Sequence, residues 1–215
     1  RIVGQRVTLE LGKCILCGIC VQLAREAADA VGLSFLSRSI DSRIGPPPGV
    51  SLDEALGSAA QACADACPTG AIIAPYKLDA RLCISYLTIE LRGAIPEQLR
   101  PLIGNRVYGC DDCQLVCPWN RFSGPCSEAD FNTRHGLDSS ELLRLFAWEE
   151  DEFEANTRGS AIHRIGYECW LRNIAVGLGN APTTAAVISA LQARQAHPSA
   201  LVREHVDWAL QQHTV

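Results

Sequence analysis

The chain of 215 residues contains no methionine, only 6% aromatic residues and no long apolar run. Without about 18 consecutive apolar residues it has no candidate membrane-spanning helix. Its N-terminus also lacks the basic flank and apolar core of a signal peptide. We therefore expect a cytoplasmic protein without membrane contact. The absence of methionine, with Arg1 at the first position, indicates a piece of a longer protein.

An excess of basic residues is also absent. The chain has 24 acidic and 19 basic residues and a formal net charge of −5. This balance excludes broad non-specific binding to nucleic acid but leaves room for a local basic face. The hydrophobic content of 47% is enough to bury a core, so the composition indicates a globular protein.

Cysteine, in contrast, is abundant: there are 11, several at tight spacings that favour metal ligation over disulfides. Cys14, Cys17 and Cys20 form a C-x2-C-x2-C triplet, which is typical of a loop wrapped around one corner of a 4Fe-4S cluster. A structural zinc site is the alternative. It is less favoured because zinc motifs usually come as pairs rather than triplets.

Two further cysteine motifs follow. The C-x3-C-P-T-G element from Cys63 to Gly70 is of the bacterial ferredoxin kind, in which the cysteine before proline usually ligates the neighbouring cluster. The second is a half-motif of Cys110, Cys113 and Cys117, with its leading cysteine moved back to Cys83. A zinc site is again the alternative to an iron-sulfur cluster here.

The first third of the chain resembles one iron-sulfur family. Val7–Leu9, Lys13–Cys20 and Ala66–Ile72 are similar to the 4Fe-4S module found in an iron-sulfur protein of respiratory complex I and in hydrogenase diaphorases, a resemblance that covers residues 1–72. It implies one cluster held by the triplet and the distant cysteine before proline. Those ligands are Cys14, Cys17, Cys20 and Cys67.

From about residue 63 to the end, the chain resembles the C-terminal half of epoxyqueuosine reductase. The similar segments are Cys67–Tyr76, Leu78–Glu90, Pro101–Arg106, Tyr108–Arg121, Gly159–Ile162, Arg164–Tyr167 and Trp170–Pro182. The resemblance implies two 4Fe-4S clusters and cobalamin as cofactors. It also implies tRNA as partner, because that family removes the epoxide oxygen from epoxyqueuosine in the anticodon loop.

Two divisions of the ligands are open. In the reductase pattern, one cluster takes Cys67, Cys83, Cys110 and Cys113, and Cys117 joins an upstream triplet that ends at Cys63. Gly57 and Ala60 occupy the other two positions of that triplet, so Cys14, Cys17 and Cys20 would replace it, with Cys63 as a further candidate ligand.

The other division keeps Cys67 with the first triplet and leaves Cys83, Cys110, Cys113 and Cys117 as a self-contained set. We favour the first division because a two-cluster ferredoxin fold requires the crossing. In both divisions, Cys126 and Cys169 are thiols without a ligand role.

The expected fold is α+β: a ferredoxin-like two-cluster module followed by an all-α, HEAT-like tail. We place an N-terminal iron-sulfur segment at 1–62, the ferredoxin-like domain at 63–125 and the tail at 126–215. Capping boxes at Ser51–Glu54 and Asp138–Glu141 predict helix starts.

The tail carries an asymmetric charge. From Ala155 to Arg203 there is one acidic residue, Glu168, against five arginines. Arginine forks suit phosphate geometry, so this segment is a candidate tRNA-contacting face. The alternative is that these are ordinary surface and helix-pairing arginines. The five are Arg158, Arg164, Arg172, Arg194 and Arg203.

These features predict the electron-relay and tRNA-docking part of an epoxyqueuosine reductase, fed by an external one-electron donor. The chain carries no catalytic residue and no cobalamin domain, so it would be an active oxidoreductase only with a cobalamin-binding partner. One alternative is an electron-transfer component that docks to a flavoprotein in an NADH-oxidising or hydrogenase complex. Another is a chimeric fragment, joined near Ala66–Ile72, with neither activity.

Overall fold

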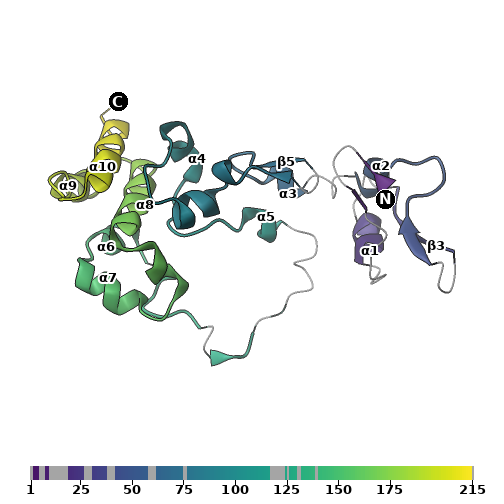
Figure 1. Cartoon of the computed structure of the whole chain (residues 1–215), viewed down its shortest axis with the longest axis horizontal. Helices are drawn as coiled ribbons and strands as arrows, with labels where there is room; N and C mark the ends of the chain where they lie inside the picture. Colours follow the sequence, from purple (N-terminus) through teal and green to yellow (C-terminus); the bar gives the residue numbers. More distant parts are fainter. Residues whose placement is uncertain are drawn as a thin grey trace. The chain divides into compact units, whose positions relative to one another are not determined.

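The computed structural model divides the chain into two compact units, each described by itself (Figure 1). Unit 1 comprises residues 1–80 and 111–124, and unit 2 comprises residues 81–110 and 125–215. The predicted ferredoxin-like domain, 63–125, is therefore shared between them; the predicted domain boundaries stay predictions. The structure describes residues 2–4, 8–9, 19–26, 31–37, 42–57, 62–74, 77–116, 124, 126–129, 132–138 and 140–214.

Among its described residues, unit 1 combines short helices with three two-stranded antiparallel sheets. The sheets pair β1 (Ile2–Val3) with β2 (Thr8–Leu9), β3 (Ser34–Leu36) with β4 (Arg43–Gly45), and β5 (Ile72–Ala74) with β6 (Lys77–Leu78). In the middle sheet, Phe35 lies opposite Ile44. The helices are α1 (Ile19–Glu26), α2 (Leu52–Leu56), α3 (Ala62–Asp65) and α5 (Asp112–Leu115).

The capping box predicted at Ser51 is confirmed. The Ser51 hydroxyl accepts the Glu54 N–H at 3.2 Å, and the Glu54 carboxylate accepts the Ser51 N–H at 2.9 Å. Helix α2 starts there because these two bonds satisfy backbone donors that have no partner within the first turn. Its buried face joins a small core of six buried residues: Val21, Ala24, Leu33, Ile44, Leu52 and Ala55.

Within its described residues, unit 2 contains helices and helical turns joined by irregular segments, and no strand. A short 3-10 turn, Ala80–Leu82, leads into it. A π-helical turn, Tyr86–Glu90, and a 3-10 turn, Glu97–Leu99, precede α4 (Arg100–Ile103). The remaining elements are α6 (Leu142–Phe146), α7 (Glu150–Thr157), a 3-10 turn at Ala161–Ile165, α8 (Tyr167–Gly179), α9 (Ala185–Ala193) and α10 (Ala200–Gln212).

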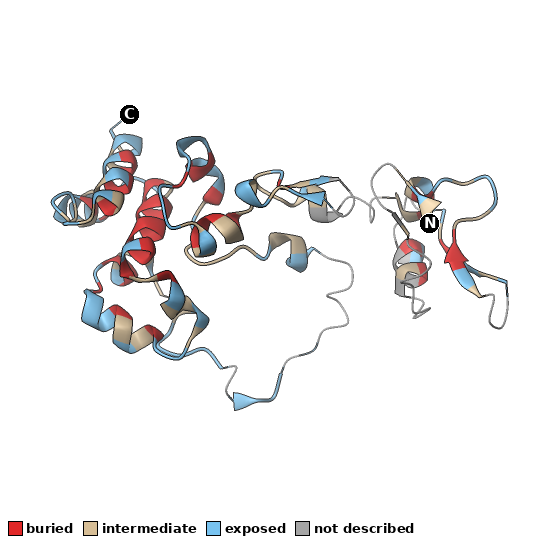
Figure 2. Ribbon diagram, in the orientation of Figure 1, coloured by how far each residue is buried: buried red, intermediate tan, exposed pale blue. Residues whose placement is uncertain are grey.

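Helix α8 forms the centre of unit 2 and is buried along almost its whole length (Figure 2). It packs mainly against α10 and also against α6. Gly179 allows the close approach to α10, since a Cβ there would lie 2.6 Å from Cζ3 of Trp208 and 2.9 Å from Cα of Ala209. The hydrophobic core around α8 includes Ile84, Leu87, Ile95 and Ile103, so the segment before α4 belongs to the same core.

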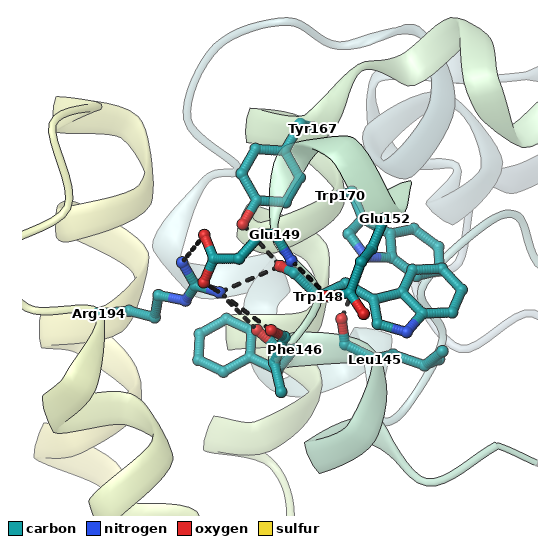
Figure 3. A network of polar contacts seen from close by, with 9 residues as sticks. Leu145, Phe146, Trp148, Glu149, Glu152, Tyr167, Trp170 and Arg194 are labelled. Atoms are coloured by element: carbon teal, nitrogen blue, oxygen red, sulfur yellow. Dashed lines mark hydrogen bonds and ion pairs between the residues drawn. The ribbon is translucent and has the colours of Figure 1, made fainter. Parts of the chain in front are cut away.

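The capping box predicted at Asp138 is wrong: α6 begins at Leu142, and its N-cap residue Glu141 makes no side-chain capping bond. The backbone just after the C-terminus of α6 is held by side chains from far along the chain (Figure 3). Tyr167 donates to the Trp148 carbonyl at 2.7 Å, and Arg194 donates to the same carbonyl at 3.1 Å. The backbone that follows α6 thus gains donors from α8 and from the C-cap residue of α9.

A second buried contact joins α10 to the loop before α4. The Ile95 N–H donates to Nε2 of His205 at 3.1 Å, so Nδ1 carries the proton and donates to the Leu201 carbonyl at 2.8 Å. His205 is completely buried. Burial lowers its pKa from 6.5 to about 4, with a further contribution from the Arg100 cation. The imidazole is therefore neutral when the protein is folded near pH 7.

The fold is mixed and rich in helix, with only small sheets, as the expected α+β class requires. The finer expectations of a ferredoxin-like module and a HEAT-like tail stay predictions. Among the described residues, no helix is long and apolar enough to span a membrane.

Replacing Gly179 with alanine should destabilise the protein. Alanine normally favours a helix interior, but this Cβ would collide with Trp208 and with the backbone of Ala209. We expect the free energy of unfolding to fall by about 1–3 kcal/mol, the usual cost of overpacking. Thermal and urea denaturation would measure it. Gly93→Ala is the matched control, because nothing lies within 4 Å of its added Cβ. Equal stability of the two variants would contradict the packing described.

The neutral His205 makes stability depend on pH. Its pKa is about 4 in the folded state and about 6.5 in the unfolded state, so only the unfolded chain gains a proton between these values. The contribution of neutral His205 to the free energy of unfolding is therefore fully present above pH 6.5. It declines by roughly 3 kcal/mol as pH falls toward 4.

Urea denaturation of the wild type and His205→Gln at several pH values would measure this contribution. Between pH 4 and 6.5 the free energy of unfolding of the variant should depend less steeply on pH than that of the wild type. The exposed His135, at a φ of 58° that asparagine tolerates, provides His135→Asn as control. Identical slopes in wild type and His205→Gln would show that His205 is not held neutral.

Candidate iron-sulfur site

Cys67 lies in a tight turn between α3 and β5 that points backbone donors at its sulfur. The Cys67 N–H donates to the Ala64 carbonyl at 3.2 Å, which closes the turn after α3. The Ala71 N–H donates to Sγ at 3.3 Å, and the Thr69 hydroxyl oxygen lies 3.8 Å from Sγ. Gly70 adopts a φ of 63°, and its N–H donates to the Cys67 carbonyl at 3.1 Å.

This turn stabilises the thiolate form of Cys67. Burial raises the pKa of the thiol, but bonds from the Thr69 side chain and from backbone N–H groups outweigh it, so the pKa of Cys67 lies below its usual value. The thiolate is the form that binds metal. N–H···S bonds also persist in iron-sulfur sites, where they help to set the reduction potential. The surroundings of Cys67 therefore fit a cluster ligand.

Cys113 lies in the same unit as Cys67. It is half-buried on α5, and α5 packs against α3, the helix that ends just before the Cys67 turn. One pair of packed short helices thus carries Cys113 and ends just before the turn that carries Cys67.

Cys83 and Cys110 both lie in unit 2, where a hydroxyl group joins their segments. The Ser85 hydroxyl accepts the Cys110 N–H at 3.1 Å and donates to the Cys110 carbonyl at 3.3 Å. Ser85 comes two residues after Cys83, at the start of the helical turn whose first bond runs from the Leu87 N–H to the Cys83 carbonyl at 3.0 Å. The segment after Cys83 is therefore hydrogen-bonded to the backbone of Cys110, although the two are distant in sequence.

The remaining predicted ligands are described only in part. Cys20 is half-buried on α1. Cys14, Cys17 and Cys117, and the side chain of Cys63, lie outside the described residues. Of the cysteines without a predicted role, Cys126 is exposed and Cys169 is buried.

No group of three or more His, Cys, Asp or Glu side chains is arranged to hold a metal ion within the described part of the chain. The favoured ligand set takes Cys67 and Cys113 from unit 1 and Cys83 and Cys110 from unit 2, and the two units are described separately. Both divisions of the ligands stay predictions. The donor set itself, thiols and backbone N–H groups, is the chemistry that an iron-sulfur cluster requires.

Arg172 belongs to the core and is excluded from the predicted basic face. It is completely buried, and Nη1 donates to the carbonyls of Leu91 and Gly93 at 2.7 Å each. Nη2 donates to the Leu87 carbonyl at 2.9 Å. Burial lowers the pKa of Arg172. A guanidinium committed to carbonyls in this way cannot contact a phosphate without unfolding its surroundings.

The other four arginines differ in how available they are. Arg194 has only 14% of its side chain exposed and holds the end of α6, and Arg203 donates to the carbonyls of His197 and Pro198. Arg164 is exposed and pairs with Glu90 at 2.5 Å. Arg158 is exposed, and its side chain makes no hydrogen bond or ion pair with the described residues. Arg158 and Arg164 are thus the members best placed to meet a ligand.

Sequence reasoning missed the side chains that hold the cysteine segments, Ser85 and Asn173 in particular. The Asn173 amide donates to the carbonyls of Thr88 and Val107, both at 2.8 Å. A signal was available, because Arg172 and Asn173 form a polar pair in an otherwise apolar stretch of helix. Such a pair is buried only when it has hydrogen-bond partners.

Comparisons with known proteins agree with the cysteine pattern. A family described as "4Fe-4S double cluster binding domain" matches residues 60–120. The chain is 65% identical to epoxyqueuosine reductase of Pseudomonas aeruginosa over 152 residues, which are 71% of this chain and 42% of that protein. It is 60% identical to the Escherichia coli enzyme over 152 residues, 70% of this chain and 40% of that protein.

Solved structures show the same relationship. Epoxyqueuosine reductase from Bacillus subtilis matches 80% of this chain with a TM-score of 0.66 and 29% identity, over 46% of its own length. An epoxyqueuosine reductase in complex with an epoxyqueuosine-modified tRNA stem loop matches 71% of this chain and 40% of its own, with a TM-score of 0.60 and 29% identity. The chain is thus homologous to part of these enzymes and spans less than half of their length. The double-cluster match begins at residue 60, so the resemblance of residues 1–72 to the complex I and diaphorase module rests on the sequence alone.

Proposed function

We propose that this chain binds two 4Fe-4S clusters and serves as the electron-relay and tRNA-docking part of an epoxyqueuosine reductase. The observation that carries the proposal is the double-cluster match over residues 60–120, which contains Cys67, Cys83, Cys110 and Cys113. The thiolate-stabilising turn around Cys67 supports it, because this turn has the donors that a cluster ligand needs.

The clusters would supply one-electron transfer. In the division that we favour, Cys67, Cys83, Cys110 and Cys113 hold one cluster, and Cys14, Cys17, Cys20 and Cys117 hold the other. The protein's part is to bury the sulfurs and donate hydrogen bonds to them, since these features set the reduction potential. The N–H of Ala71 and the hydroxyl of Thr69 would act in this way on Cys67.

Electrons would enter from an external one-electron donor and leave toward a deeper acceptor. By resemblance that acceptor is cobalamin, bound by a polypeptide region other than the one described. We therefore expect the chain by itself to bind its clusters and tRNA but to require a cobalamin-binding partner for turnover.

The ferredoxin-like module would be followed by a HEAT-like tail that docks tRNA. Helices α8, α9 and α10 contact one another, with α8 packed most closely against α10, and such stacked helices are compatible with a repeat architecture. Within this tail the exposed arginines Arg158 and Arg164 are suited to phosphate contacts. A related epoxyqueuosine reductase was solved in complex with an epoxyqueuosine-modified tRNA stem loop, which supports tRNA as the partner.

Iron counting tests the cluster proposal. A reconstituted chain should contain about eight irons, and Cys83→Ala or Cys110→Ala should lose about four of them together with one set of electron paramagnetic resonance (EPR) signals. Cys126→Ala and Cys169→Ala should keep the full content, because neither residue is a proposed ligand. Zinc in place of iron, or only about four irons in the wild type, would defeat the two-cluster assignment.

Binding to an epoxyqueuosine-modified tRNA stem loop tests the tail. Arg158→Ala and Arg164→Ala should each weaken binding and lower the salt-dependence slope by about 1, as expected for one lost phosphate contact. The melting temperature should stay almost unchanged, because Arg158 is unpaired among the described residues and the Arg164–Glu90 pair is exposed.

Arg134→Ala is the control for this experiment, because Arg134 is exposed but lies outside the segment from Ala155 to Arg203. If all three variants weaken binding equally, the contact is diffuse and the proposed face is wrong.

A further inference from the structure

Two hydroxyl groups one helical turn apart hold the backbone that carries Cys110. The Ser85 hydroxyl accepts a hydrogen bond from the Cys110 N–H and donates one to the Cys110 carbonyl. Thr88 accepts the N–H of the preceding residue, Gly109, at 3.0 Å and donates to the Ile84 carbonyl at 2.7 Å. The N–H groups of two successive residues are thus bound by two hydroxyls that lie three residues apart on the helical segment after Cys83.

The backbone conformation of Gly109 and its lack of a side chain allow this contact. Its φ of 78° lies in the left-handed region that favours glycine, and an added Cβ would lie 3.6 Å from Cδ1 of Ile89 and 3.8 Å from the Ser85 hydroxyl. The chain therefore runs close along the helical surface at this point. The path of the backbone at Gly109 determines the position of the Cα atom of Cys110.

The Thr88 side of the contact is anchored from α8. Asn173 donates to the Thr88 carbonyl and to the Val107 carbonyl, so one amide joins the segment after Cys83 to the segment before Cys110. Thr88, Arg172 and Asn173 are all completely buried. Thr88 lies in a π-helical turn, a rare element that is frequent at functional sites.

We propose that Ser85 and Thr88 are positioning residues that fix Cys110 relative to Cys83 and thereby set the properties of the cluster that these two cysteines share. The proposal rests on the proposed function, since it assumes that both are ligands. It does not depend on how the other ligands are divided, because both divisions place Cys83 and Cys110 on one cluster.

The physical reason is the cost of leaving a partly buried donor without its hydrogen bond. Removal of the Thr88 hydroxyl leaves the Gly109 N–H without its acceptor, and the backbone before Cys110 must move to find another. A ligand that moves changes the geometry and hydration around the cluster, and both affect the reduction potential.

The test uses the reconstituted full chain with Thr88→Val, which removes the hydroxyl and keeps the shape, and Thr88→Ser, which keeps the hydroxyl. We expect Thr88→Val to shift the midpoint potential and the EPR spectrum of one cluster. It should also release iron to a chelator about tenfold faster, in line with one lost buried hydrogen bond. Thr88→Ser should restore the wild-type values. Ser85→Ala, at a half-buried position, tests the same point if Thr88→Val does not fold.

Thr157→Val is the matched control. Thr157 is also completely buried and donates to the carbonyl four residues earlier, Phe153, at 2.7 Å, but its second contact is His163 rather than a cysteine segment. It should lower the melting temperature as Thr88→Val does and leave the potential and spectrum unchanged.

The outcomes separate the two proposals. If Cys83→Ala and Cys110→Ala retain all iron, the proposed ligands are wrong and the positioning role falls with them. If those variants lose a cluster while Thr88→Val and Ser85→Ala keep the wild-type potential and spectrum, the positioning role alone is overturned. A shift in Thr88→Val and Ser85→Ala, absent in Thr157→Val, supports it.

Discussion

The carbonyls in and around an irregular backbone segment are the constraint on which unit 2 depends. Residues 91–96 form no helix or strand, so they have no regular hydrogen-bond partners for their carbonyls. Arg172 of α8 donates to the carbonyls of Leu91 and Gly93 in this segment. Arg172 and Asn173 also donate to the neighbouring carbonyls of Leu87, Thr88 and Val107. Leu87 and Thr88 are buried, so loss of the donor to either carbonyl would cost about 1–3 kcal/mol.

This constraint ties the cysteine segments to the helices. Ile84, Leu87 and Ile95 share one core with α8, and Asn173 holds the backbone on both sides of the Ser85–Cys110 contact. The helical unit is thus part of the support of two proposed cluster ligands. Cys67 is supported differently, by N–H groups of its own turn. Long-range contacts therefore support the proposed ligands of unit 2, and local hydrogen bonds support Cys67 in unit 1.

Burial separates the arginines of the tail into those that bind the protein's own backbone and those that are exposed. The guanidinium groups of Arg172 and Arg194 donate hydrogen bonds to backbone carbonyls, whereas Arg158 and Arg164 lie at the surface. Composition alone treats all of them as a basic face. Only the packing of α8 and α9 shows which guanidinium groups are available to a phosphate, because a buried cation has already exchanged water for protein acceptors.

Local features were determined by the sequence itself: the capping box at Ser51, the tight turn after Cys67, the cysteine spacing typical of iron-sulfur clusters and the helical pattern of the tail. They are readable because short-range hydrogen bonds and spacing depend on neighbouring residues alone. The tertiary structure decided what is distant in sequence: Ser85 against Cys110, Asn173 between Thr88 and Val107, and the burial of Arg172. These contacts join residues 25 to 85 positions apart, where only the folded core determines which polar groups meet.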